Sequence, residues 1–393
     1  MKILLIGEYS GVHTELSKAL KNLGHDVKTI SDGDGYKSFP TDILVQNLYP
    51  NNKNILNRIY QLFLEYSGLA GICRFLRIWK SIKREMLGYD VVQLINPIAL
   101  TGFGSIVNLY LLSYLKRKNS KIFLDAVGDD YYWVKYLKQY RAKDTNLKNI
   151  YREKHFTKTH LKDFDRESYS LKYMYGLFYK KLNNYAIDIS TKVIPGLYDY
   201  QMAYQWCGKS TNIVPFSIAQ DKVGSSINMN PNEKMVIFNG WQKGKEANKG
   251  NDIFDRAARR VLHEFPDKVE YVIVQNVPFE EYIKLYSSAH IFFDQCFSQD
   301  KGVNGLLGMA AGKVVFSGLG VKTLESYPYY DATKEYGIDA MPDEEDIYKN
   351  LIALIENPKR IETISKNAIE FVMKNHLSDT VAKRYIQIWS DTI

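Results

Sequence analysis

Cysteines and long apolar runs are scarce in this sequence of 393 residues. It has three cysteines, Cys73, Cys207 and Cys296, and no CxxC pair. Three thiols cannot all pair and their spacing fits no zinc motif, so we expect a reducing compartment and no zinc site. No run approaches the roughly 18 apolar residues that a membrane span requires, and the N-terminus does not resemble a signal peptide. We therefore expect a cytoplasmic protein that does not cross a membrane.

The charge is unevenly distributed. The formal net charge is +8, and residues 53–88 carry seven Lys/Arg against two Glu, whereas residues 131–185 carry thirteen against five acids. Basic segments interleaved with aromatics attract phosphorylated ligands, anionic membranes or nucleic acid, or they are solvated helix faces. Because paired Cys/His ligands and an aromatic RNP-like strand are missing, we favour an anionic inner membrane surface and expect no nucleic-acid partner.

Apolar runs and helical periodicities alternate along the first half. Lys2–Ile6, Thr14–Leu23 and Asp26–Ile30 form a strand–helix–strand pattern with a turn at 7–11, which indicates a parallel sheet. Further strands are predicted at 90–94, 121–124 and 192–194. Ligands gather at the carboxyl ends of such strands, so the loops 7–11, 96–104 and 126–130 are predicted to lie on one rim.

A second α/β series follows an Asn- and Ser-rich stretch. Its strands are predicted at 235–238, 269–274, 290–293 and 313–316, and its helices at 252–265, 279–287, 304–311, 345–355, 358–374 and 378–389. The fold class predicted is α/β, with two doubly wound, Rossmann-like domains.

The strand that ends at Gly240 leads into a loop containing Lys245 and Lys249, and a helix is predicted to begin with Asn251 or Asp252 as its N-cap. Ammonium groups over a helix N-terminus suit a diphosphate. The alternative is a solvated basic loop with an ordinary cap.

A second candidate segment follows the apolar run that ends in Asp294. The chain passes through a glycine turn into a helix of small residues, closed by Gly312; the turn and first helical residues are Gly302, Val303, Asn304, Gly305 and Leu306. Small residues allow close approach of the backbone to a ligand, and the first helical N–H groups can bind phosphate. Close packing of the helix on the sheet explains the same residues, and the two interpretations are compatible.

These motifs resemble those of a known family. Together with Met309-Ala310-Ala311-Gly312-Lys313, they make residues 190–393 similar to the C-terminal half of group-1 type, retaining GT-B glycosyltransferases, above all those of bacterial capsular or O-antigen polysaccharide biosynthesis. The resemblance implies an acceptor-binding domain over 1–216, a nucleotide-sugar-binding domain over 217–374 across a cleft, and a segment 375–393 that returns to the first domain. It also implies that Lys245, Lys249 and the amides of Val303 to Leu306 bind the diphosphate of a UDP- or GDP-sugar.

One departure from the family concerns the nucleoside. Most members carry two acidic residues eight positions apart, the second of which binds the ribose hydroxyls; here Gln299 and Leu307 stand at these positions. Leu307 cannot accept a hydrogen bond, and Glu325 is a candidate to replace part of this contact. A non-catalytic sugar-nucleotide-binding scaffold of the same fold is the alternative.

The resemblance implies a retaining transfer in which the departing phosphate assists the acceptor hydroxyl. Lysines and helix amides can neutralise the leaving group, so we expect no metal and no cofactor, with magnesium at Asp129-Asp130 as the minor alternative. The expected acceptor is a glycan or a polyprenyl-diphosphate-linked sugar at the inner membrane face.

Candidate acceptor-side residues lie at the predicted strand ends of the first domain. Asp129, Asp130 and His13 are the catalytic candidates, and Gly11 and Asn96 are candidate acceptor contacts. His13 is interpreted as a general base, an acceptor contact or an ordinary surface residue. A dinucleotide-dependent oxidoreductase is disfavoured, because residues 7–11 do not form GxGxxG.

Overall fold

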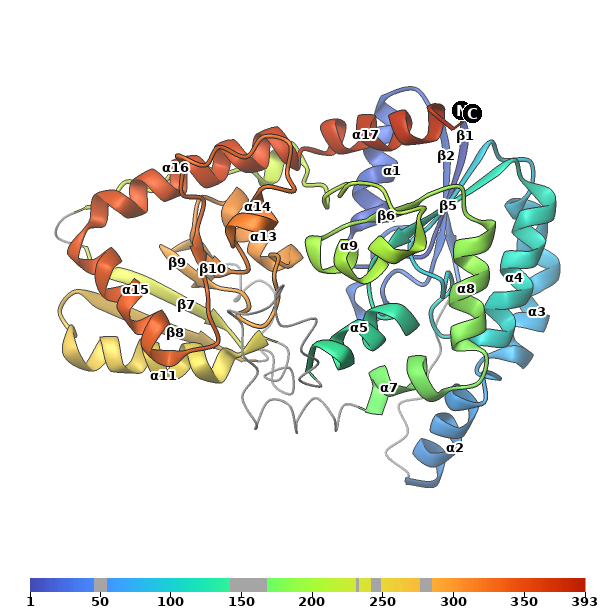
Figure 1. The fold of residues 1–393 in the computed structure, drawn as a ribbon, viewed down its shortest axis with the longest axis horizontal. Helices are drawn as coiled ribbons and strands as arrows, with labels where there is room; N and C mark the ends of the chain where they lie inside the picture. Colours follow the sequence, from blue (N-terminus) through green and yellow to red (C-terminus); the bar gives the residue numbers. More distant parts are fainter. Residues whose placement is uncertain (46–54, 142–167, 231–232, 242–248, 276–284, 393) are drawn as a thin grey trace. The chain divides into compact units, whose positions relative to one another are not determined.

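A computed structural model describes residues 1–45, 55–141, 168–230, 233–241, 249–275 and 285–392. These residues form two compact units. Unit 1 comprises the described residues of 1–139, 167–217 and 378–393, and unit 2 comprises those of 140–166 and 218–377. The sequence-based boundaries lie at 216/217 and 374/375. Each unit is built on its own parallel sheet (Figure 1).

Unit 1 contains a six-stranded sheet with the order β3-β2-β1-β4-β5-β6. The strands are β1 (Lys2–Ile6), β2 (Asp26–Ser31), β3 (Ile43–Leu44), β4 (Val91–Leu94), β5 (Lys121–Ala126) and β6 (Val193–Pro195). The helices are α1 (Val12–Asn22), α2 (Ile55–Tyr66), α3 (Ile72–Ile82), α4 (Ser105–Lys118), α5 (Tyr131–Arg141), α7 (Ser168–Tyr175), α8 (Tyr179–Ile189), α9 (Tyr198–Tyr204) and α17 (Ser378–Ser390), with 3₁₀ turns η1 (Gly35–Lys37), η2 (Lys83–Met86) and η3 (Gln205–Cys207).

Helix α17 packs against α1 and the sheet of unit 1 (Figure 1). Val381, Ala382, Tyr385 and Trp389 are buried in one cluster with apolar residues of α1 and of β1, β4, β5 and β6. Two polar bonds accompany this packing: Trp389 Nε1 donates to Gln93 Oε1 at 3.0 Å, and the Tyr385 hydroxyl donates to an Asp125 carboxylate oxygen at 2.8 Å. The expected return of the last helix to the first sheet is thus confirmed.

Unit 2 contains a five-stranded sheet with the order β11-β10-β9-β7-β8. The strands are β7 (Met235–Gly240), β8 (Val269–Val274), β9 (Ile291–Phe293), β10 (Val314–Ser317) and β11 (Ile338–Asp339). The helices are α11 (Asn251–Glu264), α13 (Val303–Ala310), α14 (Val321–Leu324), α15 (Glu344–Glu356) and α16 (Pro358–Asn375), with the 3₁₀ turn η4 (Gln220–Lys222). The side chains of β9 and β10 are buried throughout, as expected for a parallel sheet covered on both faces.

The α/β fold class and nearly all predicted elements among the described residues are confirmed. The predicted helix 279–287 lies mostly outside them. The structure adds β3 and β11, two-residue edge strands that periodicity cannot detect. The predicted N-cap of α11 is wrong: Gly250 caps the helix with φ 74°, without a side-chain bond, and Asn251 lies inside it. A side chain at position 250 would also lie 2.2 Å from Cys296 Sγ, which explains the glycine.

We expect Trp389→Ala to destabilise unit 1 by about 3–5 kcal/mol, because a fully buried indole leaves a cavity and an unpaired Gln93. The measurement is denaturant-induced unfolding followed by circular dichroism. The matched control is Gln387→Ala on the exposed side of the same helix, which should change the midpoint little. Equal effects of the two substitutions would contradict the packing described for α17.

Candidate functional site

The carboxyl ends of β7 and β9 meet in the middle of the second sheet. These strands are neighbours, whereas β8 lies on one side of them and β10 on the other, so the chain direction across the sheet reverses here. Such a reversal leaves a crevice at the carboxyl ends of the strands in doubly wound sheets. Gly240 ends β7 and Asp294 follows β9, so both residues lie at this edge.

Asp294 joins the loop after β7, the loop after β9 and the end of β10. Its Oδ1 lies 3.1 Å from Nζ of Lys249, which lies between β7 and α11. Its Oδ2 accepts hydrogen bonds from the Gly302 N–H and the Ser317 hydroxyl, both at 2.9 Å. The carboxylate is fully buried, and the Lys249 side chain is 20% exposed. Asp294 therefore fixes an accessible ammonium group next to the start of α13.

The first turn of α13 offers unbonded amides. Gly302 is its N-cap in extended conformation and no side chain caps it. Helix geometry therefore leaves the N–H groups of Val303, Asn304 and Gly305 without intrahelical acceptors. A Cβ on Gly305 would lie 2.4 Å from Asp294 Oδ2, so glycine allows the helix to approach the carboxylate closely.

Two of the predicted phosphate donors are already engaged. The Leu306 N–H donates to the Gly302 carbonyl at 2.9 Å, and the Gly302 N–H donates to Asp294. Fewer groups can therefore bind a phosphate than the motif predicted. They are the three amides of Val303 to Gly305 and the ammonium group of Lys249. Lys245, predicted to assist them, lies outside the described residues.

The residues predicted near the nucleoside lie in separate segments of unit 2. Leu307 is 37% exposed on the second turn of α13. The Gln299 carbonyl accepts a hydrogen bond from the Thr323 hydroxyl at 2.8 Å, which ties its loop to α14. Glu325 is exposed directly after α14. Their contact with a nucleoside stays a prediction.

Sequence reasoning missed a buried ion pair beneath this loop. Lys301 is 1% exposed, and its Nζ lies 3.2 Å from Asp300 Oδ1 and 4.0 Å from the centre of the Tyr327 ring. The Tyr327 hydroxyl donates to Asp300 Oδ2 at 2.8 Å. Burial lowers the pKa of Lys301, and the charge of Asp300 opposes this shift. The pair anchors the chain immediately before Gly302, and no periodicity distinguishes it from an exposed loop.

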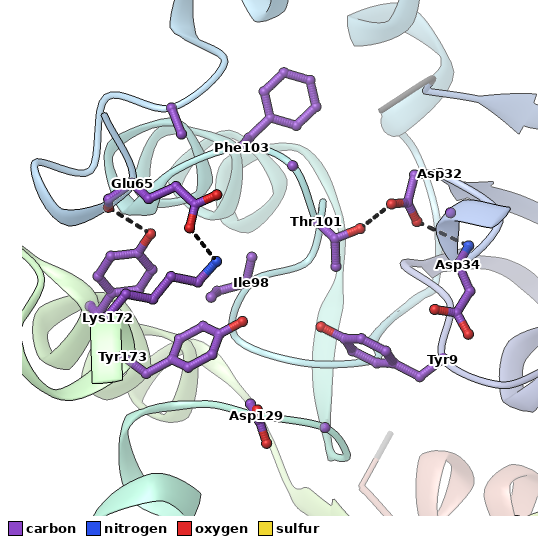
Figure 2. Close-up of a pocket in the computed structure, with 15 residues that line it drawn as sticks. Tyr9, Asp32, Asp34, Glu65, Ile98, Thr101, Phe103, Asp129, Lys172 and Tyr173 are labelled. Atoms are coloured by element: carbon purple, nitrogen blue, oxygen red, sulfur yellow. Dashed lines mark hydrogen bonds and ion pairs between the residues drawn. The ribbon is translucent and has the colours of Figure 1, made fainter. Parts of the chain in front are cut away.

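Unit 1 has a pocket of about 410 Å³ at the carboxyl ends of its own strands (Figure 2). This volume lies within the roughly 300–1,000 Å³ typical of small-molecule sites. Tyr9 follows β1, residues 98–103 follow β4, and Gly128 and Asp129 follow β5. The prediction that these three loops share one rim is confirmed.

Other lining residues were not predicted. Asp32 and Asp34 follow β2, Glu65 comes from α2, and Lys172 and Tyr173 come from α7. The only local signal was the Asp32-Gly33-Asp34-Gly35 turn after the second strand. Glu65 and Lys172 are 107 positions apart in the sequence, and only the fold brings them together.

The pocket wall is held by polar contacts. The Thr101 hydroxyl donates to Asp32 Oδ2, and the Asp34 N–H donates to Asp32 Oδ1 at 3.1 Å. Lys172 Nζ donates to Glu65 Oε2 at 3.0 Å on the opposite side (Figure 2).

Asn96 and Gly11, predicted to contact the acceptor, belong to these rim loops but are not among the residues that line the pocket. Asn96 is fully buried: its Nδ2 donates to the Val127 carbonyl at 2.7 Å, and its Oδ1 accepts the Ile98 N–H at 2.9 Å. It therefore holds two rim loops together. Gly11 caps α1 with φ 86°, and a Cβ there would lie 3.0 Å from the Phe39 ring.

Three solved structures are similar to the chain over nearly its full length. HepE from Anabaena, solved in complex with UDP and glucose, is 12% identical with a TM-score of 0.57, and 100% of both chains is covered. Sucrose-phosphate synthase from Thermosynechococcus elongatus is 13% identical with a TM-score of 0.59, covering 100% of this chain and 99% of that chain. A glycosyltransferase from Rickettsia africae is 14% identical with a TM-score of 0.53, covering 99% and 97%.

The fold is GT-B. No family model and no curated protein matches the sequence. Within the part of the chain that the structure describes, no group of three or more His, Cys, Asp or Glu side chains is arranged to hold a metal ion. None of the described helices is long and apolar enough to cross a membrane.

His13 is buried on helix α1 of unit 1. It is 2% exposed, so it is not the surface residue that was one interpretation. Its Nδ1 donates to the Gly7 carbonyl at 2.8 Å, and its Nε2 lies 3.2 Å from Asp125 Oδ2. Burial raises the pKa of Asp125, while bonds from His13 and Tyr385 oppose the shift. With both nitrogens engaged, His13 ties α1 to the loop after β1 and to Asp125 of β5, and it is not among the residues that line the pocket.

Asp130 also differs from its expected role. Whereas Asp129 lines the pocket, Asp130 is 2% exposed. Its Oδ1 accepts the Trp133 N–H at 2.9 Å and its Oδ2 accepts the Tyr204 hydroxyl at 2.6 Å. Burial raises the pKa of Asp130 to about 7, although these hydrogen bonds oppose the shift. Asp130 therefore caps α5 and binds Tyr204, and the catalytic prediction remains for Asp129.

This pKa predicts a pH-dependent stability. Between about pH 4 and pH 7 the folded protein retains a proton on Asp130 that the unfolded chain has released, so stability falls as the pH rises through this window. We expect Asp130→Asn to reduce this decrease in the free energy of unfolding, because the amide does not titrate. Each pKa unit of difference between the folded and unfolded states corresponds to about 1.4 kcal/mol. Unfolding midpoints between pH 4 and pH 8 measure it. Asp188→Asn, at an exposed position, is the control, and an identical pH profile for Asp130→Asn and the unmodified protein would refute the assignment.

Proposed function

We propose that this protein transfers a sugar from a nucleotide-diphosphate donor, bound by unit 2, to an acceptor bound by unit 1. The observation that carries the proposal is the arrangement of Lys249 and the open first turn of α13 at the reversal of the second sheet. An ammonium group and converging helix amides supply the charge and the donors that a diphosphate requires. The similarity to HepE, which was solved with UDP-glucose, supports the same interpretation.

The chemistry follows from charge that develops on the leaving diphosphate. Lys249 is held by one oxygen of Asp294 and keeps part of its surface exposed, so it can contact a second anion without leaving its place. The amides of Val303 to Gly305 are fixed before the reaction by the helix, which removes the cost of reorganising water around the product. This leaving-group stabilisation needs no metal ion.

We propose further that the transfer proceeds with retention and serves polysaccharide biosynthesis, as the family resemblance implies. We propose Asp129 as the carboxylate that contacts the acceptor hydroxyl, because it is the one catalytic candidate from the sequence that lines the pocket. The anomeric configuration of the product, determined by NMR, tests retention, and an inverted product would refute it.

A non-catalytic scaffold is the second candidate, and the exposed Leu307 favours it. A leucine at this position supplies no acceptor for ribose hydroxyls. Hydrolysis of a panel of UDP- and GDP-sugars separates the two candidates: a folded protein that binds nucleotide but hydrolyses no donor would be the scaffold.

We expect Lys249→Met to weaken binding of UDP or GDP by about 10- to 100-fold, because one charge-assisted bond to the diphosphate is lost. Isothermal titration calorimetry measures this. Lys249→Arg, which retains the charge, should recover most of the affinity, and Lys349→Met removes a charge from an exposed position on α15 as the control. Unchanged affinity in Lys249→Met, with a normal circular dichroism spectrum, would exclude this phosphate site.

A membrane-facing surface belongs to the same proposal. Six large apolar side chains on α2 are 36–71% exposed and recur at helical spacing: Ile55, Leu56, Ile59, Tyr60, Leu62 and Phe63. Leu177 and Phe178 are also exposed, and the Leu177 N–H donates to the Tyr66 carbonyl at the end of α2. Arg58, Lys180 and Lys181 flank these residues and are exposed. We propose that this surface, the α2 surface, contacts anionic lipid at the cytoplasmic face of the inner membrane.

We expect the double variant Ile59→Ser/Phe63→Ser to reduce flotation with anionic vesicles at low salt by about tenfold, because two apolar side chains no longer enter the lipid. Met373→Ser, an exposed apolar residue of unit 2, is the control. Wild-type protein that fails to float with such vesicles would remove the membrane from the proposal.

A further inference from the structure

The pocket of unit 1 is acidic, although the segments around it are basic in sequence. Four carboxylate side chains line it, those of Asp32, Asp34, Glu65 and Asp129. Lys172 is the one cationic residue among the described lining residues. The described lining therefore differs in charge from the sequence segments 53–88 and 131–185, which have an excess of lysine and arginine.

The charge of Lys172 is already compensated. It is 3.0 Å from Glu65, and the two side chains are 8% and 12% exposed. Lys37, outside the lining, pairs with Asp34 at 2.6 Å. Even with both lysines included, the carboxylates exceed the ammonium groups among the residues that the structure describes here. In a partly desolvated cavity such an excess repels phosphate and attracts amines and hydroxyl hydrogens.

Aromatic side chains form walls of the pocket against which a sugar ring can pack. Tyr9 and Tyr173 point their hydroxyl groups toward one another across the cavity (Figure 2). Phe103 and Tyr179 are the other two aromatic lining residues among those described, and each is less than 5% exposed. Carboxylates and tyrosines together supply acceptors for hydroxyl groups and apolar faces for the C–H groups of a sugar ring.

We propose that this pocket selects an acceptor sugar that is uncharged or carries an amine, and that it excludes a sugar phosphate or a diphosphate. The role of that sugar as acceptor rests on the proposed function. Binding of the sugar by the pocket does not depend on that role. A lipid-linked acceptor would place its terminal sugar in the pocket and keep its phosphates outside.

The test uses ligand-observed NMR with the whole protein and no donor. The probes are glucose, galactose and mannose, each as the free sugar, the 2-amino-2-deoxy sugar and the 6-phosphate. For at least one of the three sugars we expect binding in the order amine, neutral, phosphate, with at least tenfold between the extremes. Stronger binding of the phosphates, or binding of none of the nine probes, would overturn the proposal.

Two variants locate the charge that makes the selection. Asp32→Asn should weaken binding of the amino sugar about fivefold and leave the neutral sugar nearly unchanged, whereas Asp26→Asn, at the opposite end of β2, should change neither. Glu65→Gln releases the charge of Lys172 and should raise the binding of the 6-phosphate relative to the neutral sugar. Identical profiles in Asp32→Asn and Asp26→Asn would also overturn the proposal. Because no nucleotide is present, failure here is distinguishable from failure of the donor site, which Lys249→Met reports.

Discussion

The candidate donor site depends on one buried carboxylate. Asp294 receives hydrogen bonds from the loop that opens α13 and from the end of β10, and it pairs with Lys249. A buried carboxylate without these partners would cost several kcal/mol, so the need to satisfy it holds these three segments together. The same constraint requires glycine at position 305, where any side chain would displace the carboxylate. The position of the ammonium group and that of the helix amides are thus set by the same group.

The two sheets of the protein carry sites of opposite electrostatic character. At the reversal point of the second sheet, a lysine and helix amides offer positive potential. Among the described residues that line the pocket of the first sheet, carboxylates are in excess. Under the proposed function, this contrast agrees with a diphosphate held by unit 2 and an acceptor sugar held by unit 1.

Most strands and helices followed from the sequence because their apolar patterns extend over four or more residues. The strands β3 and β11 did not, since two residues carry no periodicity. The glycine turn before α13 could be recognised from the sequence because its residues are consecutive, whereas Lys249 and Asp294, 45 positions apart, come together only in the fold. The unit 1 pocket was only half predictable: the rim loops follow predicted strands, but Glu65 and Lys172 meet only through the packing of α2 and α7. His13 and Asp130 show the opposite difficulty, because a polar residue beside a glycine turn looks exposed until its partners, Asp125 and Tyr204, are known.

The course of the chain through unit 1 has a consequence for biosynthesis. Unit 1 begins with β1 but obtains Tyr385 and Trp389, part of its core, from α17, which follows unit 2 in the sequence. During translation, the face of the first sheet that α17 covers stays exposed to solvent until residues 218–377 have been synthesised. Synthesis proceeds at about 5–20 residues per second, so the roughly 160 residues from 218 to 377 correspond to a delay of about 8–32 seconds. In that interval the nascent chain would benefit most from a chaperone that covers the apolar residues around α1.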